Sequence, residues 1–269
     1  MSGLDLEDKY PLHNAAREGR LDNLRTLLAS KKYDVNKGTF ELVRPLHEAC
    51  LAGHFDCALL LIEYGANVNL TNIDGATALC DACSSGDIQC VRLLLQHGAL
   101  VNPPLLLTTP LHEAVFRDHC KCLVLLINCG ANMNKSDCHY GTPLHIAACK
   151  GYKNSAAILL RSGACPNIPQ IHQTPLHEAA RSQDVEFLEL LLAHGANVYA
   201  CNSRGLTARQ LVPSSTSSCK ILLQEWEKMP RSLLHYCRLR IRTALGPHRL
   251  KFIPCLQIPN VLMKFVNFE

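Results

Sequence analysis

The stretch Thr174-Pro175-Leu176-His177-Glu178-Ala179 is one copy of a motif that recurs through most of this 269-residue chain. Close copies begin at Thr109 and Thr142, and weaker ones at Tyr10, Arg44, Thr77 and Thr207. Counted from the second letter, the copies start at residues 11, 45, 78, 110, 143, 175 and 208, so each step is 32 to 34 residues. Such a regular period predicts a chain of similar structural units, each packed on its neighbours.

Each unit carries signals for two helices. Proline in the second position of the motif suits the first turn of a helix, where its missing N–H costs nothing, and the threonine before it can cap that helix. A turn follows, at Gly53, Gly86 or Gly151 in three of the units, and a Leu- and Ile-rich second helix ends at Gly-Ala, as at Gly65-Ala66. The segment between that ending and the next motif, for example residues 69–77, is predicted to form a β-hairpin.

This period and this motif resemble those of the ankyrin-repeat family. The resemblance implies an all-α solenoid of about six to seven repeats, in which each repeat is a helix-turn-helix plus a β-hairpin. We assign residues 1–229 to it, with a degenerate last repeat that caps the stack. The recurring histidines are interpreted as hydrogen-bond partners of the hairpin backbone rather than as metal ligands, because they return with the period: His13, His47, His112, His145 and His177.

The fifteen cysteines follow the repeats rather than a pattern of pairs. Cys50 and Cys83 share one column, and Cys57, Cys90 and Cys122 share another, both on faces expected to be buried. Reduced cysteine in such columns acts as a small apolar side chain. No secretory signal is recognised before the first repeat, and no apolar run approaches the ~18 residues of a membrane span. We therefore expect a cytoplasmic protein, with the nucleus also accessible to it, and no membrane partner.

Beyond Pro230 the period stops and the charge balance changes. The net charge of the chain is +4, but residues 230–269 alone carry seven Lys or Arg and a single acid. Three short helices are predicted there: one that begins after Ser232, a short second one, and a third that Pro259 opens. Forty residues bury too small a core to stand alone, so we expect this domain to need a partner or the end of the repeat stack.

Two segments of this tail resemble the two halves of a SOCS box. Residues 232–241, Ser-Leu-Leu-His-Tyr-Cys-Arg-Leu-Arg-Ile, are similar to its elongin-binding half, in which Ser, Thr or Pro precedes Leu, with Cys four residues on and an aliphatic residue four further. Residues 256–262, Leu-Gln-Ile-Pro-Asn-Val-Leu, are similar to its cullin-binding half, with Gln257 in place of the usual first proline. Repeats followed by this box resemble the ankyrin-repeat and SOCS-box family across essentially the whole chain.

That resemblance implies a non-catalytic substrate receptor of a cullin-RING ubiquitin ligase. The repeats would hold an unidentified target protein, while the box at residues 230–269 would bind elongin B–elongin C and cullin 5 with its RING partner. Carried onto this sequence, the elongin-binding residues are Leu233, Cys237 and Ile241, and the cullin-binding residues are Leu256, Ile258, Pro259 and Leu262.

Two alternatives to this interpretation stay open. In the first, the tail helix only packs on Trp226 and the last repeat, which would leave an ankyrin scaffold without a ligase role. In the second, exposed loop thiols such as Cys129, Cys138 and Cys201 make the chain a redox-sensing scaffold.

No catalytic, metal or cofactor site is predicted. Three His-Glu pairs begin like the zinc-protease motif H-E-x-x-H, but each lacks the second histidine. Cys80 and Cys83 form a lone pair without a second pair at ligand spacing. Arg238, Arg240 and Arg242 spread around a helix with no interleaved aromatic residues, which argues against nucleic-acid binding. We therefore expect no enzymatic activity, no cofactor or metal, and no nucleic-acid partner.

The candidate substrate surface follows from the same resemblance, because ankyrin-repeat proteins usually bind through hairpin tips and the outer side of the first helices. The candidates are Phe40, Glu48, Ile73, Asp81, Leu105, Leu106, Leu107, Glu113, Phe116, Tyr140 and His172. The three leucines with Phe116 would form an apolar hot spot, unless they tuck under neighbouring hairpins. The acids that follow the recurring histidine share a column and would favour a basic partner, although local hydrogen bonds to the hairpin explain them more simply.

Overall fold

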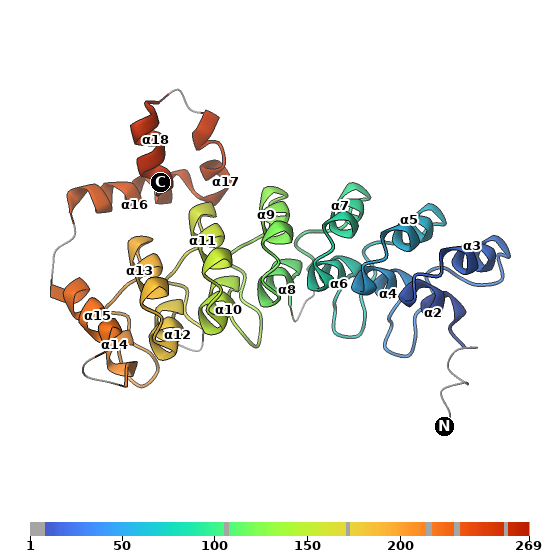
Figure 1. The fold of residues 1–269 in the computed structure, drawn as a ribbon, viewed down its shortest axis with the longest axis horizontal. Helices are drawn as coiled ribbons and strands as arrows, with labels where there is room; N and C mark the ends of the chain where they lie inside the picture. Colours follow the sequence, from blue (N-terminus) through green and yellow to red (C-terminus); the bar gives the residue numbers. More distant parts are fainter. Residues whose placement is uncertain are drawn as a thin grey trace. The chain divides into compact units, whose positions relative to one another are not determined.

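The computed structural model describes residues 9–104, 108–170, 173–213, 217–228, 232–255 and 258–268. It divides the chain into two compact units, Met1–Ala131 and Asn132–Glu269. Both units are built from helices (Figure 1). Within the described ranges, no helix is long and apolar enough to cross a membrane.

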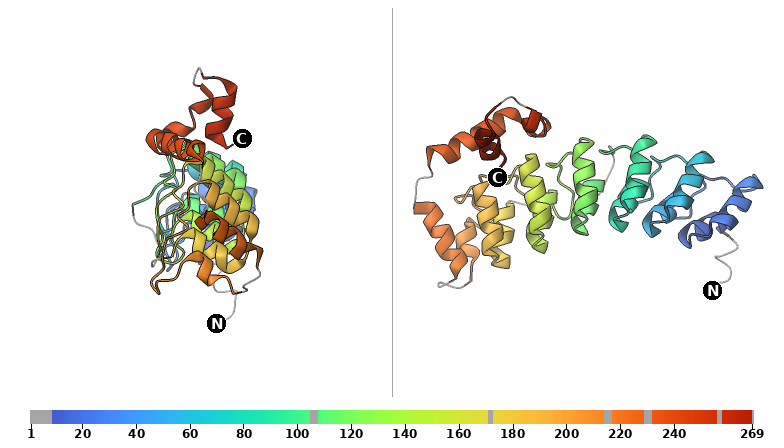
Figure 2. Two further views of the ribbon diagram at one scale, coloured as in Figure 1. Left: turned by 90° about the vertical axis from the view of Figure 1, so that its left-hand side faces the viewer. Right: turned by 45° about the horizontal axis from the view of Figure 1, so that its top comes forward.

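The described residues of the first unit form four helix pairs. They are α2 (Pro11–Arg17) with α3 (Leu21–Ala29), α4 (Pro45–Ala52) with α5 (Phe55–Glu63), α6 (Ala78–Ser85) with α7 (Ile88–Gln96), and α8 (Pro110–Phe116) with α9 (Cys120–Asn128). The first helices of successive pairs pack on one another in one layer, and the second helices pack in another (Figure 2). Leucines from both helices, such as Leu79 and Leu94, fill the space between the layers and are fully buried.

The second unit continues the same pairing. It holds α10 (Pro143–Lys150) with α11 (Lys153–Ser162), α12 (Pro175–Ser182) with α13 (Val185–Ala193), and α14 (Ala208–Leu211) with α15 (Ser218–Lys228). Four further elements follow: α16 (Leu233–Leu245), α17 (Pro247–Leu250), the 3₁₀ helix η1 (Ile253–Cys255) and α18 (Asn260–Asn267). The predicted all-helical repeat array, with a short degenerate last repeat and a small helical domain after it, is confirmed.

Within each unit, recurring histidines join one repeat to the next, as the sequence predicted. In the fifth repeat Nδ1 of His145 accepts a hydrogen bond from the backbone N–H of Thr142 at 3.2 Å. Its Nε2 then lies 3.1 Å from the carbonyl oxygen of Gln173, in the loop before α12. Because Nδ1 is an acceptor, Nε2 must carry the proton and donate it to that carbonyl.

The bond from Nε2 recurs at three other repeats, and the bond to Nδ1 recurs at His47 and His177. Nε2 of His13, His47 and His177 lies 2.9, 3.3 and 3.2 Å from the carbonyls of Val43, Ala76 and Leu206. Burial lowers the pKa of all three imidazoles, to about 4 for His47, so they stay neutral at physiological pH. A neutral ring is the form that the bridge requires.

The expected β-hairpins are tighter than predicted. The described residues contain no extended strand, only isolated antiparallel bridges, at Thr71–Thr77, Gln170–Gln173 and Cys201–Thr207. Asn72 shows the reason: its side-chain oxygen accepts from the backbone N–H groups of Asp74 and Ala76. With backbone donors satisfied by a side chain, the loop closes as a turn before a ladder can form.

A second connection between repeats was missed from the sequence. In several repeats an asparagine after the second helix binds the backbone of the next Gly-Ala ending. Asn69 donates from Nδ2 to the carbonyl of Gly98 at 3.0 Å and accepts from the N–H of Leu100 at 2.9 Å. Asn36 and Asn167 make the same pair of bonds to their following repeats. The signal was present in the sequence, because these asparagines return with the period.

The cysteine columns behave as expected. All fifteen cysteines are free thiols, and Cys50, Cys83, Cys57, Cys90 and Cys122 are buried. Burial raises the pKa of the Cys80 thiol to about 12 and that of Cys122 to about 11. Thiols with such values stay protonated and pack as small apolar groups.

We predict that His145→Ala lowers the free energy of unfolding by about 1–3 kcal/mol, because it leaves the buried N–H of Thr142 without its acceptor and removes one of the two donors to the Gln173 carbonyl. The measurement is urea denaturation followed by circular dichroism. His139→Ala is the matched control, because His139 is exposed and should change stability little. Equal losses in the two variants would contradict the bridging role.

Candidate protein-binding sites

The first candidate site is one face of α16. Ser232 caps this helix by accepting a hydrogen bond at Oγ from the N–H of His235 at 3.3 Å. The spacing of four residues then places Leu233, Cys237 and Ile241 on a common face. Leu233 is 79% exposed, Ile241 is 41% exposed, and Cys237 is exposed as well. We call these three residues the α16 outer face; it offers aliphatic surface that the chain leaves largely open at Leu233 and partly open at Ile241.

The tail domain has its own small core, which sets what α18 exposes. Leu250, Ile253 and Val266 are buried together, with Met263 and Phe265 packed beside them. Because those residues use the inner side of α18, the outer side carries the predicted cullin-binding Leu262, which is 51% exposed. Pro259 is exposed at the start of α18 and Ile258 is half-buried, whereas Leu256 lies outside the described residues.

Two exposed apolar residues of this domain were not among the predicted site residues. Leu234 is 61% exposed next to the α16 outer face, and Val261 is 78% exposed next to Leu262. Both are more exposed than Ile241, so they extend the two apolar surfaces. The sequence contains no clear signal for these two residues, because the SOCS-box pattern specifies only some of the positions on each helix.

Trp226 contacts the tail domain through a different residue from those of the outer face. Its ring meets that of His235 edge to face, with centroids 5.9 Å apart. The alternative in which the stripe of Leu233, Cys237 and Ile241 packs on Trp226 is therefore not the arrangement observed, because the stripe is exposed.

The second candidate site lies on the loop tips of the first unit. Phe40 is 94% exposed at the tip of the turn closed by the Thr39 N–H and the Val43 carbonyl at 2.9 Å. Ile73, at the next tip, is 60% exposed, and its N–H donates to the carbonyl of Glu41 at 3.0 Å. This bond ties the two tips together, so Phe40 and Ile73 form one apolar edge. Leu42, 44% exposed, belongs to it and was missed.

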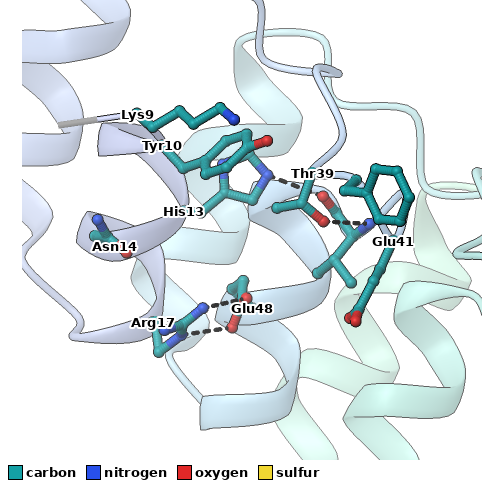
Figure 3. A pocket seen from close by; sticks show the side chains of 10 residues that line it. Lys9, Tyr10, His13, Asn14, Arg17, Thr39, Glu41 and Glu48 are labelled. Carbon is teal, nitrogen blue, oxygen red and sulfur yellow. Dashed lines mark hydrogen bonds and ion pairs between the residues drawn. The ribbon is translucent and has the colours of Figure 1, made fainter. Parts of the chain in front are cut away.

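A pocket of about 370 Å³ opens beside this edge, between α2, the 39–43 turn and α4 (Figure 3). Phe40 and Glu48, which the sequence proposed separately, both line it, together with Tyr10 and Arg17. Arg17 holds Glu48 with two bonds, Nη2–Oε1 at 2.6 Å and Nε–Oε2 at 2.9 Å (Figure 3). Glu48 therefore pairs across the repeat interface rather than with its hairpin, and its charge is largely compensated.

Asp81 differs from Glu48 because no cation compensates it. It stands on α6 at the equivalent position, between the helices that carry Glu48 and Glu113. Burial raises the pKa of its carboxyl to about 8, and the charges of Glu113 and Glu48 add to the effect. Within the described residues, the carboxylate has no ion pair or hydrogen bond. Asp81 is thus largely protonated at neutral pH, and a cation placed beside it would favour its charged form.

The remaining candidates are scattered or outside the described residues. Tyr140, 47% exposed, belongs to the second unit, while Glu113 and Phe116 are half-buried on α8. Leu105, Leu106, Leu107 and His172 lie outside the described residues, so the proposed apolar hot spot stays a prediction. No group of three potential metal ligands comes together in the described part of the chain.

Comparison with known protein families identifies the class of protein to which this chain belongs. The family model for ankyrin repeats, in three copies, matches residues 2–72, 46–137 and 111–202, and the model for the SOCS box matches residues 229–267. The combination defines an ankyrin-repeat protein with a carboxy-terminal SOCS box.

Whole-chain relatives agree with this class. The chain is 42% identical over 262 residues to ankyrin repeat and SOCS box protein 5 of Mus musculus, covering 97% of this chain and 79% of that protein. It is 40% identical over 263 residues to protein 11 of the same series in Mus musculus, covering 97% and 80%. The crystal structure of the human ASB11 ankyrin repeat domain is 41% identical, with a TM-score of 0.75, and covers 82% of this chain and 99% of that one. The chain belongs to the ankyrin repeat and SOCS box family, whose general role is substrate reception for ubiquitin ligases.

We predict that Asp81→Asn stabilises the protein at pH 8 and above but not near pH 4. The folded-state pKa of about 8 lies above the ordinary value of 3.8, so the folded state binds this proton more tightly than the unfolded state. The stability that Asp81 contributes is therefore complete below pH 3.8 and is lost as pH rises toward 8.

Thermal denaturation across this pH range tests the prediction. At pH 8 the variant should melt at least about 2 °C higher than the parent protein. Asp74→Asn is the control, because Asp74 is exposed at a loop tip and should shift the melting temperature little. A gain for Asp81→Asn that does not vary with pH would contradict the assigned pKa.

Proposed function

We propose that this chain is the substrate-recognition subunit of a ubiquitin ligase of the elongin B/C–cullin 5 type. The observation that carries the proposal is the α16 outer face, an exposed aliphatic stripe on a capped helix. An amphipathic helix that presents such a stripe is a ligand for a hydrophobic groove. Exposed leucine is unfavourable in water, so the stripe is better explained by a partner than by stability of the chain alone.

In this proposal the two parts of the chain have separate roles. Residues 1–229 hold the target protein and residues 230–269 attach it to the ligase. Leu233 fills a pocket on elongin C, with Cys237 and Ile241 packed beside it. Leu256, Ile258, Pro259 and Leu262 face the cullin. The chain positions the target protein and does not itself catalyse ubiquitin transfer, which is carried out by the recruited partners.

The target protein is proposed to meet the edge formed by Phe40 and Ile73, with its basic residues toward the acidic column. The support is the exposure of the two tips and the Asp81 carboxyl on α6, whose charged form has no cation of this chain beside it and would be favoured by a basic residue of the target. A buried aromatic anchor surrounded by weaker contacts is the usual composition of a binding hot spot.

We predict that Leu233→Ala weakens elongin B–elongin C binding by at least about 2 kcal/mol, roughly thirtyfold, because it empties the anchor position. Isothermal titration with the purified elongin pair measures the affinity. Phe252→Ala is the matched control, because Phe252 is an exposed apolar residue of the same domain outside the stripe, at 54% exposure. If the unaltered chain does not bind the elongin pair, the proposed function is wrong and a scaffold is what remains.

We further predict that Phe40→Ser with Ile73→Ser reduces the target proteins captured from cells while elongin binding is retained. The double change removes the apolar edge but leaves the repeat-to-repeat bonds of the backbone intact. Elongin binding is measured on the double variant itself, and target capture is measured by quantitative mass spectrometry with Leu233→Ala added to every variant to block degradation. Val124→Ser, an equally polar change at a 42% exposed position of α9, is the control. Equal capture by all variants would exclude this edge.

A further inference from the structure

Arg242 is a charged residue with no role in the proposed elongin or cullin contacts, and it is only 8% exposed. It lies on α16, five positions after Cys237 and nine after Leu233. At about 100° per residue these offsets turn it roughly 140° and 180° away from those residues around the helix. The outer face of α16 is thus exposed, while the opposite face sends an arginine into the protein.

The guanidinium of Arg242 binds the carboxy-terminal ends of two helices. Nη2 donates to the carbonyls of Leu160 at 2.9 Å and Arg161 at 2.5 Å, in the last turn of α11. Nη1 donates to the carbonyl of Val266 at 2.9 Å, in the last turn of α18. Carbonyls in a last helical turn carry the negative end of the helix dipole and have few donors from the helix itself, although that of Leu160 also accepts from the N–H of Gly163 at 3.1 Å. One side chain therefore caps a repeat helix and a helix of the SOCS box together.

The charge of Arg242 is compensated by these carbonyls rather than by an acid. Burial lowers the pKa of the guanidinium to about 10, with a further contribution from the charge of Arg238, so it stays cationic at neutral pH. The ring of Phe268 lies 5.2 Å from the guanidinium carbon and adds a cation–π contact. A buried cation is costly unless it is fully hydrogen-bonded, so it favours one arrangement of the two helices over others.

The surroundings of Arg242 fit the same docked arrangement. A Cβ atom at Gly163 would lie 2.8 Å from Cδ1 of Leu250 and 3.0 Å from Cα of Pro247. One at Gly195 would lie 3.0 Å from Cδ1 of Leu239. Phe268 stacks on His194 with ring centroids 3.9 Å apart. The box therefore packs on the Gly-Ala endings of the fifth and sixth repeats, in addition to the contact between His235 and Trp226 of the last repeat.

We infer that Arg242 is a positioning residue that clamps the SOCS box onto the fifth and sixth repeats and so fixes the direction in which the α16 outer face points. The clamp and the outer face use opposite sides of one helix, so docking on the repeats and binding of a partner occur together. The functional meaning of the clamp rests on the proposed ligase role, because a fixed direction matters when a held target must meet an attached ligase. The clamp itself is a property of the free chain.

The test compares distances between the repeats and the box in the full-length chain. Spin labels carried by non-natural amino acids at exposed Lys150 on α10 and Lys264 on α18 report that distance by pulsed electron resonance. The unaltered chain should give a single narrow distance. Arg242→Leu should lose it, because leucine cannot bind the three carbonyls. Arg242→Lys should restore it in part, because an ammonium can cap one helix but cannot span both.

Arg240→Leu is the matched control, because Arg240 is exposed on the same helix and carries the same charge. It should keep the narrow distance. Circular dichroism verifies that each variant retains folded repeats, and the elongin affinity of Arg242→Leu should stay within about twofold of the parent. A narrow distance retained in Arg242→Leu would overturn the inference. Absence of elongin binding in every variant would instead reject the proposed function and leave the clamp standing.

Discussion

The structure depends on a neutral imidazole held between two backbone groups of successive repeats. The histidine accepts from the N–H at the start of its own helix and donates to a carbonyl in the next loop, as His145 does between Thr142 and Gln173. The carbonyl also accepts from the N–H of Gln170 in an isolated bridge, so the histidine joins that turn to the start of its own helix. The ring can serve both only while it is uncharged, and burial keeps it so. The asparagine bridges, such as Asn69 to Gly98, do the same work at the other end of each helix pair.

These bridges decide which surfaces are free to bind. The bridges lie on the inner side of the loops and at the start of the first helices. The loop tips and the outward side of the first helices are therefore not needed for packing between repeats. Phe40 can therefore be 94% exposed without loss of the fold. The acids of one column also differ in their surroundings. Glu48 is paired with Arg17, whereas Asp81 has no such partner, and burial and the charges of its acidic neighbours raise its pKa. Equivalent positions in a repeat protein thus acquire different chemistry from what the adjacent repeat supplies.

The SOCS box poses a different problem, because its core is too small to hold it in place. Leu250, Ile253 and Val266 form a cluster that closes only one side of α16 and α18. The fifth and sixth repeats supply the missing surface, and a buried arginine supplies the direction. One helix then has an inner side fixed by its own chain and an outer side left for a partner. This division is what an adaptor needs, since attachment to the ligase must not compete with attachment to the repeats.

Much of this protein could be predicted from its sequence. The repeats, their helix boundaries near Pro143 or Ser218, the bridging histidines and the buried cysteine columns all follow from residues that return every 32 to 34 positions. The bonds concerned join residues about one repeat apart, 28 to 31 positions along the chain, so the period of the sequence already contains them. The α16 outer face could be predicted as well, because a spacing of four fixes a face of a helix.

Only the tertiary structure decided where the box docks and which acid lacks a cation. Arg242 reaches carbonyls 81 and 82 positions away, and backbone carbonyls have no sequence signature. The union of Phe40 and Glu48 in one pocket, and the difference between Glu48 and Asp81, likewise depend on side chains that meet across repeat interfaces. The sequence by itself determined the units and their repeating bonds, because these are local and periodic. Contacts that occur only once in the chain were determined by the tertiary structure alone, because no period of the sequence indicates them.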